Sequence, residues 1–158
     1  MELIILMGLQ ASGKSTFYRL HFATTHAHVS KDLFRNNKRP DRRQMHLVEE
    51  AFKAGQSVVV DNTNPTPVVR EPLIRLAHAY GAEVIGYYFE SETRSSIERN
   101  KTRSGKARVP DVAIYVTSKN WCGPRMRKGS ISYMMYVSWI IPNLKYTNGY
   151  RTRFNRNA

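Results

Sequence analysis

A glycine-rich segment near the start of the chain has the residue types needed to hold a triphosphate. Residues 8–15 read Gly-Leu-Gln-Ala-Ser-Gly-Lys-Ser and fit the pattern G-x-x-x-x-G-K-[ST] in full. An apolar run comes directly before this segment and a helical pattern directly after it, which is the context that the motif requires. The glycines let backbone N–H groups and a helix N-terminus face a phosphate. We therefore predict a P-loop here.

Two side chains of this loop are expected to carry chemistry. Lys14 is predicted to reach the β- and γ-phosphates of ATP, and Ser15 to supply a ligand for Mg²⁺. The other loop residues predicted to contact the nucleotide are Gly8, Ala11, Ser12, Gly13 and Thr16. The alternative, a glycine-rich turn that merely contains a lysine, fits the flanking strand and helix poorly. ATP and Mg²⁺ are thus the predicted cofactors, although switches, motors and kinases all use a P-loop.

Asp32 and Arg35 form a candidate pair for transfer to an alcohol. They follow a short predicted strand, and a separation of three residues places both side chains on one face if a helix begins there. Phosphoryl transfer to an alcohol needs a carboxylate that orients and deprotonates the hydroxyl, and a cation that holds a phosphate of the acceptor. An N-capping aspartate with an exposed ion pair is the open alternative.

Asp61 closes an apolar run at residues 58–60, in the position of a Walker B acid. Its carboxylate is suited to hold Mg²⁺ through water or to anchor a neighbouring cation. The alternative is a strand-terminal aspartate that starts a turn, because Asp and Asn are favoured turn residues.

A basic stretch at residues 103–110 is predicted to be a flexible lid. Arg103, Lys106 and Arg108 are candidates to close over the triphosphate and to stabilise the charge on the moving phosphoryl group. Basic residues on a loop are also often simply solvated, so both interpretations stay open.

Short β-type runs alternate with helical patterns along the chain, which predicts βαβ units and a largely parallel sheet. The expected strands cover residues 3–7, 27–30, 57–61 and 83–89. The expected helices cover residues 14–22, 41–54, 69–80, 93–102 and 111–120. Pro72 is expected either to kink the third helix or to restart it after a first turn. The predicted class is α/β, a three-layer P-loop NTPase fold with a central, mainly parallel sheet.

Composition narrows the class of protein further. The 158 residues suit a single domain, and a formal charge of +13 favours polyanionic partners. No apolar run approaches the roughly 20 residues of a membrane span. Cys122 is the only cysteine, so no disulfide framework is possible and a cytoplasmic setting is expected. The five histidines lack a metal-ligand spacing and receive no role.

Four linked segments resemble the polynucleotide kinase family. They are residues 8–16, 29–35, 60–64 and 99–110, and their order and spacing match as well. The similarity covers roughly residues 1–125, as in the kinase modules of the phage enzyme and of bacterial RNA-repair proteins. It implies a kinase domain in that range and an atypical tail at residues 126–158.

The resemblance also implies roles for individual residues. Asp32 would be the general base for a 5′-hydroxyl, Arg35 would hold the adjacent phosphate of the acceptor, and Asp61 would support the acceptor site. Arg103 matches the family's lid arginine, and Arg108 or Lys106 its second lid cation. The implied reaction is transfer of the ATP γ-phosphate to the 5′-hydroxyl end of a nucleic acid. The alternatives are a kinase for a small alcohol and a nucleotide-gated binding module without transfer chemistry.

The tail departs from the family, whose chains commonly run through an acidic Glu-Glu-Gly-Phe-Asp segment into a last strand. Here the tail is basic. Back-translation of residues 126–139 with permitted codons lets a shifted frame read Glu-Glu-Gly-Phe-Asp-Lys-Leu-Tyr-Asp-Val-Arg-Glu-Leu. A frameshifted gene is therefore a hypothesis, and in-frame codons unable to encode the acidic segment would remove it. In that case the last strand would be absent or would be formed instead by residues 131–141, and the tail would say nothing about partners.

Overall fold

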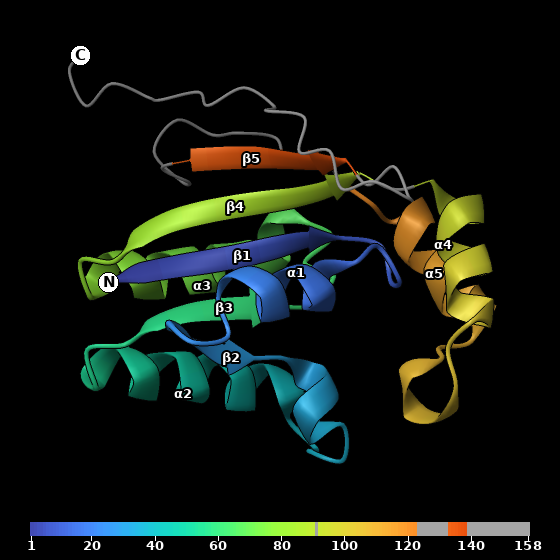
Figure 1. Cartoon of the computed structure of the whole chain (residues 1–158). Helices are drawn as coiled ribbons and strands as arrows, with labels where there is room; N and C mark the ends of the chain where they lie inside the picture. The colour runs from blue at the N-terminus through green and yellow to red at the C-terminus, as the bar shows by residue number, and fades with distance from the viewer. Residues whose placement is uncertain (91, 123–132, 139–158) are drawn as a thin grey trace.

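The computed structural model of this protein describes residues 1–90, 92–122 and 133–138. Most of the atypical tail, and with it the frameshift hypothesis, lies outside the described residues. Within them the chain alternates strands with helices, as Figure 1 shows. The predicted α/β class is therefore confirmed.

A parallel sheet forms the centre of the fold. Its strands are β1 (Glu2–Gly8), β2 (His26–Val29), β3 (Ser57–Asp61), β4 (Glu83–Glu90) and β5 (Tyr133–Ser138). Among the described residues the strand order is β2-β3-β1-β4-β5, and each neighbouring pair is parallel. The strand β5 falls inside residues 131–141, where the sequence suggested a substitute last strand. The four predicted strands match β1 to β4 within one residue at either end.

Helices cover both faces of the sheet, which makes three layers (Figure 1). The helices are α1 (Lys14–His21), α2 (Pro40–Lys53), α3 (Pro67–Ala79), α4 (Thr93–Lys101) and α5 (Asp111–Lys119), with short 3₁₀ turns at η1 (Lys31–Phe34) and η2 (Gly105–Ala107). The helix α1 packs its aromatic side chains on one face of β1, whereas α2 and α3 pack on the other face. Burial of both faces explains why β1 and β3 read as continuous apolar runs.

Two local expectations changed in the structure. The third helix begins at Pro67, where the Thr66 hydroxyl accepts a hydrogen bond from the Val69 N–H, and it runs through Pro72 without restarting. The early start has a physical reason, because proline at the first helical position lacks only an N–H that would be unpaired anyway. The predicted lid is not wholly irregular either, since it contains the turn η2.

The strand register decides where the site lies. Leu6 of β1 lies beside Asp61 of β3, and Gly8 lies beside Phe89 of β4. The carboxyl ends of three neighbouring strands therefore meet at one edge, where ligands bind in open α/β sheets. In Figure 1 the helices α4 and α5 stand beside this edge.

Candidate active site

The P-loop forms the floor of the candidate site. Three of its residues have positive φ angles, 156° at Gly8, 59° at Ala11 and 96° at Gly13, and they turn the backbone tightly between β1 and α1. Gly8 is required for a second reason as well. A Cβ atom there would lie 2.9 Å from Phe89 Cβ, Phe89 O and Ser12 Oγ. A methyl group at that position would therefore displace β4 or the loop.

The Lys14 side chain is buried within the P-loop. Its Nζ donates to the carbonyl oxygens of Gly8 and Leu9, at 2.9 and 2.6 Å, and to Ser12 Oγ at 3.1 Å. These contacts hold the ammonium group against the loop, beside the backbone amides at the start of α1. A preformed cluster of donors of this kind fits the phosphates of a nucleotide.

The pKa of Lys14 is lowered to about 8, chiefly by burial, and the Arg103 charge acts in the same direction. The charges of Asp61 and Asp32 oppose the shift. Between pH 8 and the ordinary lysine value, the unfolded chain binds more protons than the folded chain. Stability contributed by this group therefore rises with pH across that window, on the order of 3 kcal/mol in total.

The wild-type protein and Lys14→Met should accordingly differ in their pH dependence. Urea unfolding of both proteins at several pH values from 7 to 10 would give the difference in unfolding free energy directly. We expect the stability of wild type to gain on that of the variant as pH rises. A difference that stays constant over this range would contradict the lowered pKa.

The helices α4 and α5 hold the loop from outside. Arg99 Nε donates to the Ala11 carbonyl oxygen at 2.9 Å, and Gln10 Nε2 donates to Thr117 Oγ1 at 2.8 Å. Neither contact was anticipated from the sequence, because 88 and 107 residues separate the partners. The two bonds tie the phosphate-binding loop to the helices that flank the lid.

Asp61 lies buried at the carboxyl end of β3. Burial alone would raise its pKa, but hydrogen bonds from His28 and Ser15 and the charge of Lys14 outweigh burial, so the net shift is downward. The carboxylate is therefore ionised at neutral pH. Asp61 and the Ser15 hydroxyl together offer oxygen ligands of the type that Mg²⁺ prefers, so these residues fit the predicted metal. Within the described residues no group of three or more His, Cys, Asp or Glu side chains is suited to hold a metal.

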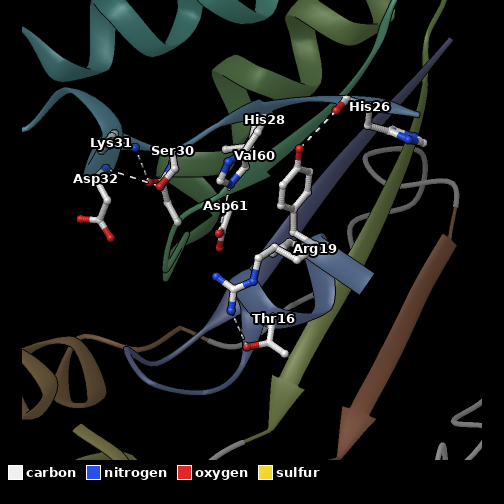
Figure 2. A network of polar contacts seen from close by, with 12 residues as sticks. Thr16, Arg19, His26, His28, Ser30, Lys31, Asp32, Val60 and Asp61 are labelled. Atoms are coloured by element: carbon white, nitrogen blue, oxygen red, sulfur yellow. Dashed lines mark hydrogen bonds and ion pairs between the residues drawn. The ribbon is translucent and has the colours of Figure 1, made fainter. Parts of the chain in front are cut away.

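His28 is a site residue that the sequence analysis missed. Its Nε2 lies 3.3 Å from Asp61 Oδ2 (Figure 2). The His28 ring also stacks on Tyr18 of α1, with centroids 3.9 Å apart. His28 faces Val59 across the β2–β3 ladder, which puts it on the same side of the sheet as Asp61. No local sequence signal marks a histidine that acts through strand register.

Asp32 lies in η1, directly after β2, and backbone contacts set its position. The Asp32 N–H donates to Ser30 Oγ at 3.4 Å, and the Lys31 N–H donates to Asn62 Oδ1 at 3.0 Å. Asn62 in turn donates to Gln44 of α2 at 2.7 Å. Figure 2 shows Ser30, Lys31 and Asp32 next to the end of β3 that carries Asp61.

Arg35 pairs with Asp32, as the spacing of three residues suggested. Its Nε and Nη2 donate to Asp32 Oδ1 at 3.0 and 2.8 Å, and its Nη1 donates to the Lys106 carbonyl oxygen. The guanidinium group thereby bridges η1 and the lid. Both side chains are exposed, so the pair is accessible to an acceptor.

The buried side chain of Asn100 holds the two ends of the lid together. Asn100 donates to the Val109 carbonyl oxygen and to Asp111 Oδ1, at 2.7 and 2.9 Å, and accepts from the Val109 N–H at 3.1 Å. This clamp closes residues 101–108 into a compact loop. Of its cations, Arg103 faces the P-loop, whereas Lys106 and Arg108 are exposed.

One cleft of about 580 Å³ collects most of the predicted residues. It brings together Ala11, Ser12, Gly13, Lys14, Ser15, Thr16, Asp32, Asp61 and Arg103. Gly8, Arg35, Lys106 and Arg108 do not line it. Gly8 packs against Phe89 and Ser12 below the cleft. Arg35 lies outside the lining and donates to Asp32, which does line the cleft. Nucleotide contacts from Lys106 and Arg108 stay predictions.

The turn after β3 adds residues that the sequence analysis did not assign. Asn62, Thr63 and Asn64 line the cleft wall. Asn64 adopts a positive φ of 45°, and its Nδ2 donates to the Leu6 carbonyl oxygen at 2.8 Å. Buried Arg70 donates to the Asn64 carbonyl oxygen at 2.7 Å. This turn is therefore held to β1 and α3, which keeps Asp61 in place.

The cleft, its loop and the sheet order can be compared with known proteins. Residues 3–121 match the model of a family described as AAA domain. The chain belongs to the AAA domain family. The matched residues of this AAA domain span β1 to α5, so they include every predicted site residue.

One curated relative of this AAA domain is the bifunctional polynucleotide phosphatase/kinase of Schizosaccharomyces pombe (strain 972 / ATCC 24843). The two are 25% identical over 132 residues, which are 81% of this chain and 31% of the relative. The chain thus spans less than a third of that relative's length. The distant similarity agrees with the family resemblance seen in the sequence.

Two solved structures share the fold of this AAA domain. Kti12 of Chaetomium thermophilum, in complex with ADP-AlF3, has a TM-score of 0.68 at 17% identity, over 87% of this chain and 89% of that one. A gluconokinase from Sinorhizobium meliloti 1021 has a TM-score of 0.63 at 17% identity, over 89% and 84% of the two chains. Family, motif and sheet order show that the chain has the P-loop fold seen in kinases, and this fold implies nucleotide binding. Among the described helices, none has the length and apolar character to cross a membrane.

Proposed function

We propose that this chain is a kinase that transfers the γ-phosphate of ATP to the 5′-hydroxyl end of a polynucleotide. The Asp32–Arg35 pair carries this proposal. It places a carboxylate on the wall of the P-loop cleft and an exposed guanidinium group 2.8 Å from that carboxylate. An acceptor whose hydroxyl lies near a phosphate fits such a pair, because one group takes a proton while the other holds an anion.

Each of three side chains in the cleft has a separate role in the proposed transfer. Asp32 accepts the proton of the 5′-hydroxyl as that oxygen forms its bond to the γ-phosphorus and the bond from this phosphorus to the bridging oxygen of ADP breaks. Lys14 and the loop amides bind the β- and γ-phosphates. Arg103 stabilises negative charge on the transferred group.

Ser15 and Asp61 are the residues that would hold Mg²⁺. The bound ion would neutralise charge on the β- and γ-phosphate oxygens. His28 fixes the orientation of the Asp61 carboxylate from behind, as a positioning residue, and Tyr18 supports the histidine ring.

The alternative is a kinase for a small alcohol, because a gluconokinase shares this fold. The outward-facing Arg35 favours a phosphorylated acceptor over it. A nucleotide-gated binding module would not need the carboxylate of Asp32 at all. The sequence similarity to the kinase-containing relative supports transfer to a polynucleotide.

The test is transfer of labelled γ-phosphate from ATP to short 5′-hydroxyl DNA and RNA oligonucleotides. Matched oligonucleotides that already carry a 5′-phosphate, gluconate, and reactions with excess chelator are the controls. We expect label only on 5′-hydroxyl ends and only with Mg²⁺ present. Label on gluconate alone would favour the small-alcohol kinase, and nucleotide binding without transfer to any acceptor would favour the binding module.

A further inference from the structure

A basic stripe runs along the exposed start of α2. Arg39, Arg42, Arg43 and His46 follow one another at i, i+3, i+4 and i+7, the spacing of a single helix face. With Asn37 they line a surface hollow of about 530 Å³, separate from the P-loop cleft. We call this surface the α2 basic groove.

The arginines of this groove lack acidic partners in the described part of the chain. No ion pair there involves Arg39, Arg42 or Arg43. The one acid that lines the hollow, Glu49, is already bonded to Tyr80 Oη at 3.1 Å and to Lys53 Nζ at 3.2 Å. Like charges at i and i+4 destabilise a helix, so this stripe costs stability unless an anion compensates it.

The groove continues from the acceptor side of the cleft. Lys31 lines the cleft, and its Nζ pairs with Asp41 Oδ1 in the first turn of α2. Arg35 and Asn37 lie on the segment that joins η1 to α2, and Asn37 itself lines the hollow. An acceptor strand whose terminal phosphate is held by Arg35 would need only to follow this segment to reach Arg39, Arg42 and Arg43.

We propose that the α2 basic groove binds the phosphate backbone of a single-stranded acceptor, beyond its terminal nucleotide. This inference rests on the proposed function and extends it from the reacting end to the body of the strand. From Arg39 to His46 the stripe spans eight residues, about 10 Å along the helix axis. Its three arginines lie on one face of the helix, so they can pair with neighbouring phosphates of the same strand.

The test compares two triple variants that each remove three positive charges. One is Arg39→Gln with Arg42→Gln and Arg43→Gln in the groove. The matched control is Arg75→Gln with Arg94→Gln and Lys119→Gln, exposed cations on α3, α4 and α5. Binding of a fluorescent 12-nucleotide single strand bearing a 5′-phosphate is measured by anisotropy between 50 and 300 mM salt, which needs no turnover.

The groove variant should bind the 12-nucleotide strand more weakly, with a slope of log affinity against log salt reduced by about 2. The control should keep the slope of wild type. For transfer, the ratio of kcat/KM for a 12-nucleotide acceptor to that for a nucleoside 3′-monophosphate should fall about tenfold in the groove variant only.

Equal slopes in the groove variant and the control would overturn the inference. Tighter binding of polyglutamate than of the oligonucleotide by wild type would also overturn it, because the groove would then select an acidic polypeptide. A failure of the proposed function would give a different result from a failure of this inference. In that case wild type transfers no phosphate to any 5′-hydroxyl, while the binding measurement still reports on the groove.

Discussion

Replacing Asp32 with alanine is expected to lower kcat for transfer to a 5′-hydroxyl by about 10² to 10⁴, with little change in ATP binding. The reason is local. Asp32 contacts no P-loop residue through a hydrogen bond, yet it lines the same cleft as Lys14 and pairs with Arg35. Its loss would remove the proposed proton acceptor and leave the hydrogen bonds of the phosphate-binding loop in place.

Steady-state rates with a 5′-hydroxyl oligonucleotide, together with an ATP titration, measure both quantities. Asp32→Asn is the sharper variant, because the amide oxygen still accepts from Arg35 but the side chain cannot take a proton. Glu71→Ala is the matched control, since Glu71 is an acid of similar exposure, 64% against 74%, that does not line the cleft. Near-normal turnover in Asp32→Asn would limit Asp32 to holding Arg35.

Replacing Arg103 with glutamine is expected to reduce kcat by about 10² to 10³, the usual effect of losing one charge-stabilising donor. Arg103 is the lid cation that lines the cleft, and its charge reaches Lys14 strongly enough to lower the pKa of that lysine. Among the described residues, its side chain makes one hydrogen bond, a long one of 3.4 Å to the Ala107 carbonyl oxygen. The guanidinium group is therefore available to a transferred phosphoryl group.

Lys106→Gln and Arg108→Gln provide the comparison within the same loop. Both side chains are exposed and outside the cleft lining, so each loss should cost less than about tenfold in kcat. Single-turnover rates and ADP affinities for the three variants separate chemistry from binding. A larger loss for Arg108→Gln than for Arg103→Gln would mean that the lid rearranges when nucleotide binds.

Hydrogen bonds of Arg35 and Asn100 connect the lid to the proposed acceptor site and to α5. Arg35 joins η1 to the lid through the Lys106 carbonyl oxygen, while Asn100 fastens the base of the lid to the start of α5. If Arg35 binds a phosphate of the acceptor, as proposed, its hydrogen bond to the Lys106 carbonyl oxygen would connect acceptor binding to the loop that carries Arg103.

Much of the fold followed from short-range patterns. The strands, helices and P-loop were predicted within a few residues because each depends on consecutive residues, as in the apolar run at 58–60 or the glycines that bracket the loop. The third helix was the main exception. Its start at Pro67 depends on the Thr66 cap, and Pro72 is tolerated inside it.

By itself, the sequence determined the phosphate-binding loop, the carboxylates at strand ends and the parallel α/β class, since those features arise from neighbouring residues and from periodicity. Only the tertiary structure decided which distant side chains complete the site. Strand register brings His28 to Asp61, helix packing brings Arg99 and Thr117 to the loop, and the lid clamp presents Arg103 while leaving Lys106 and Arg108 exposed. Such contacts join residues tens of positions apart, and their geometry exists only after the sheet and its helices have packed.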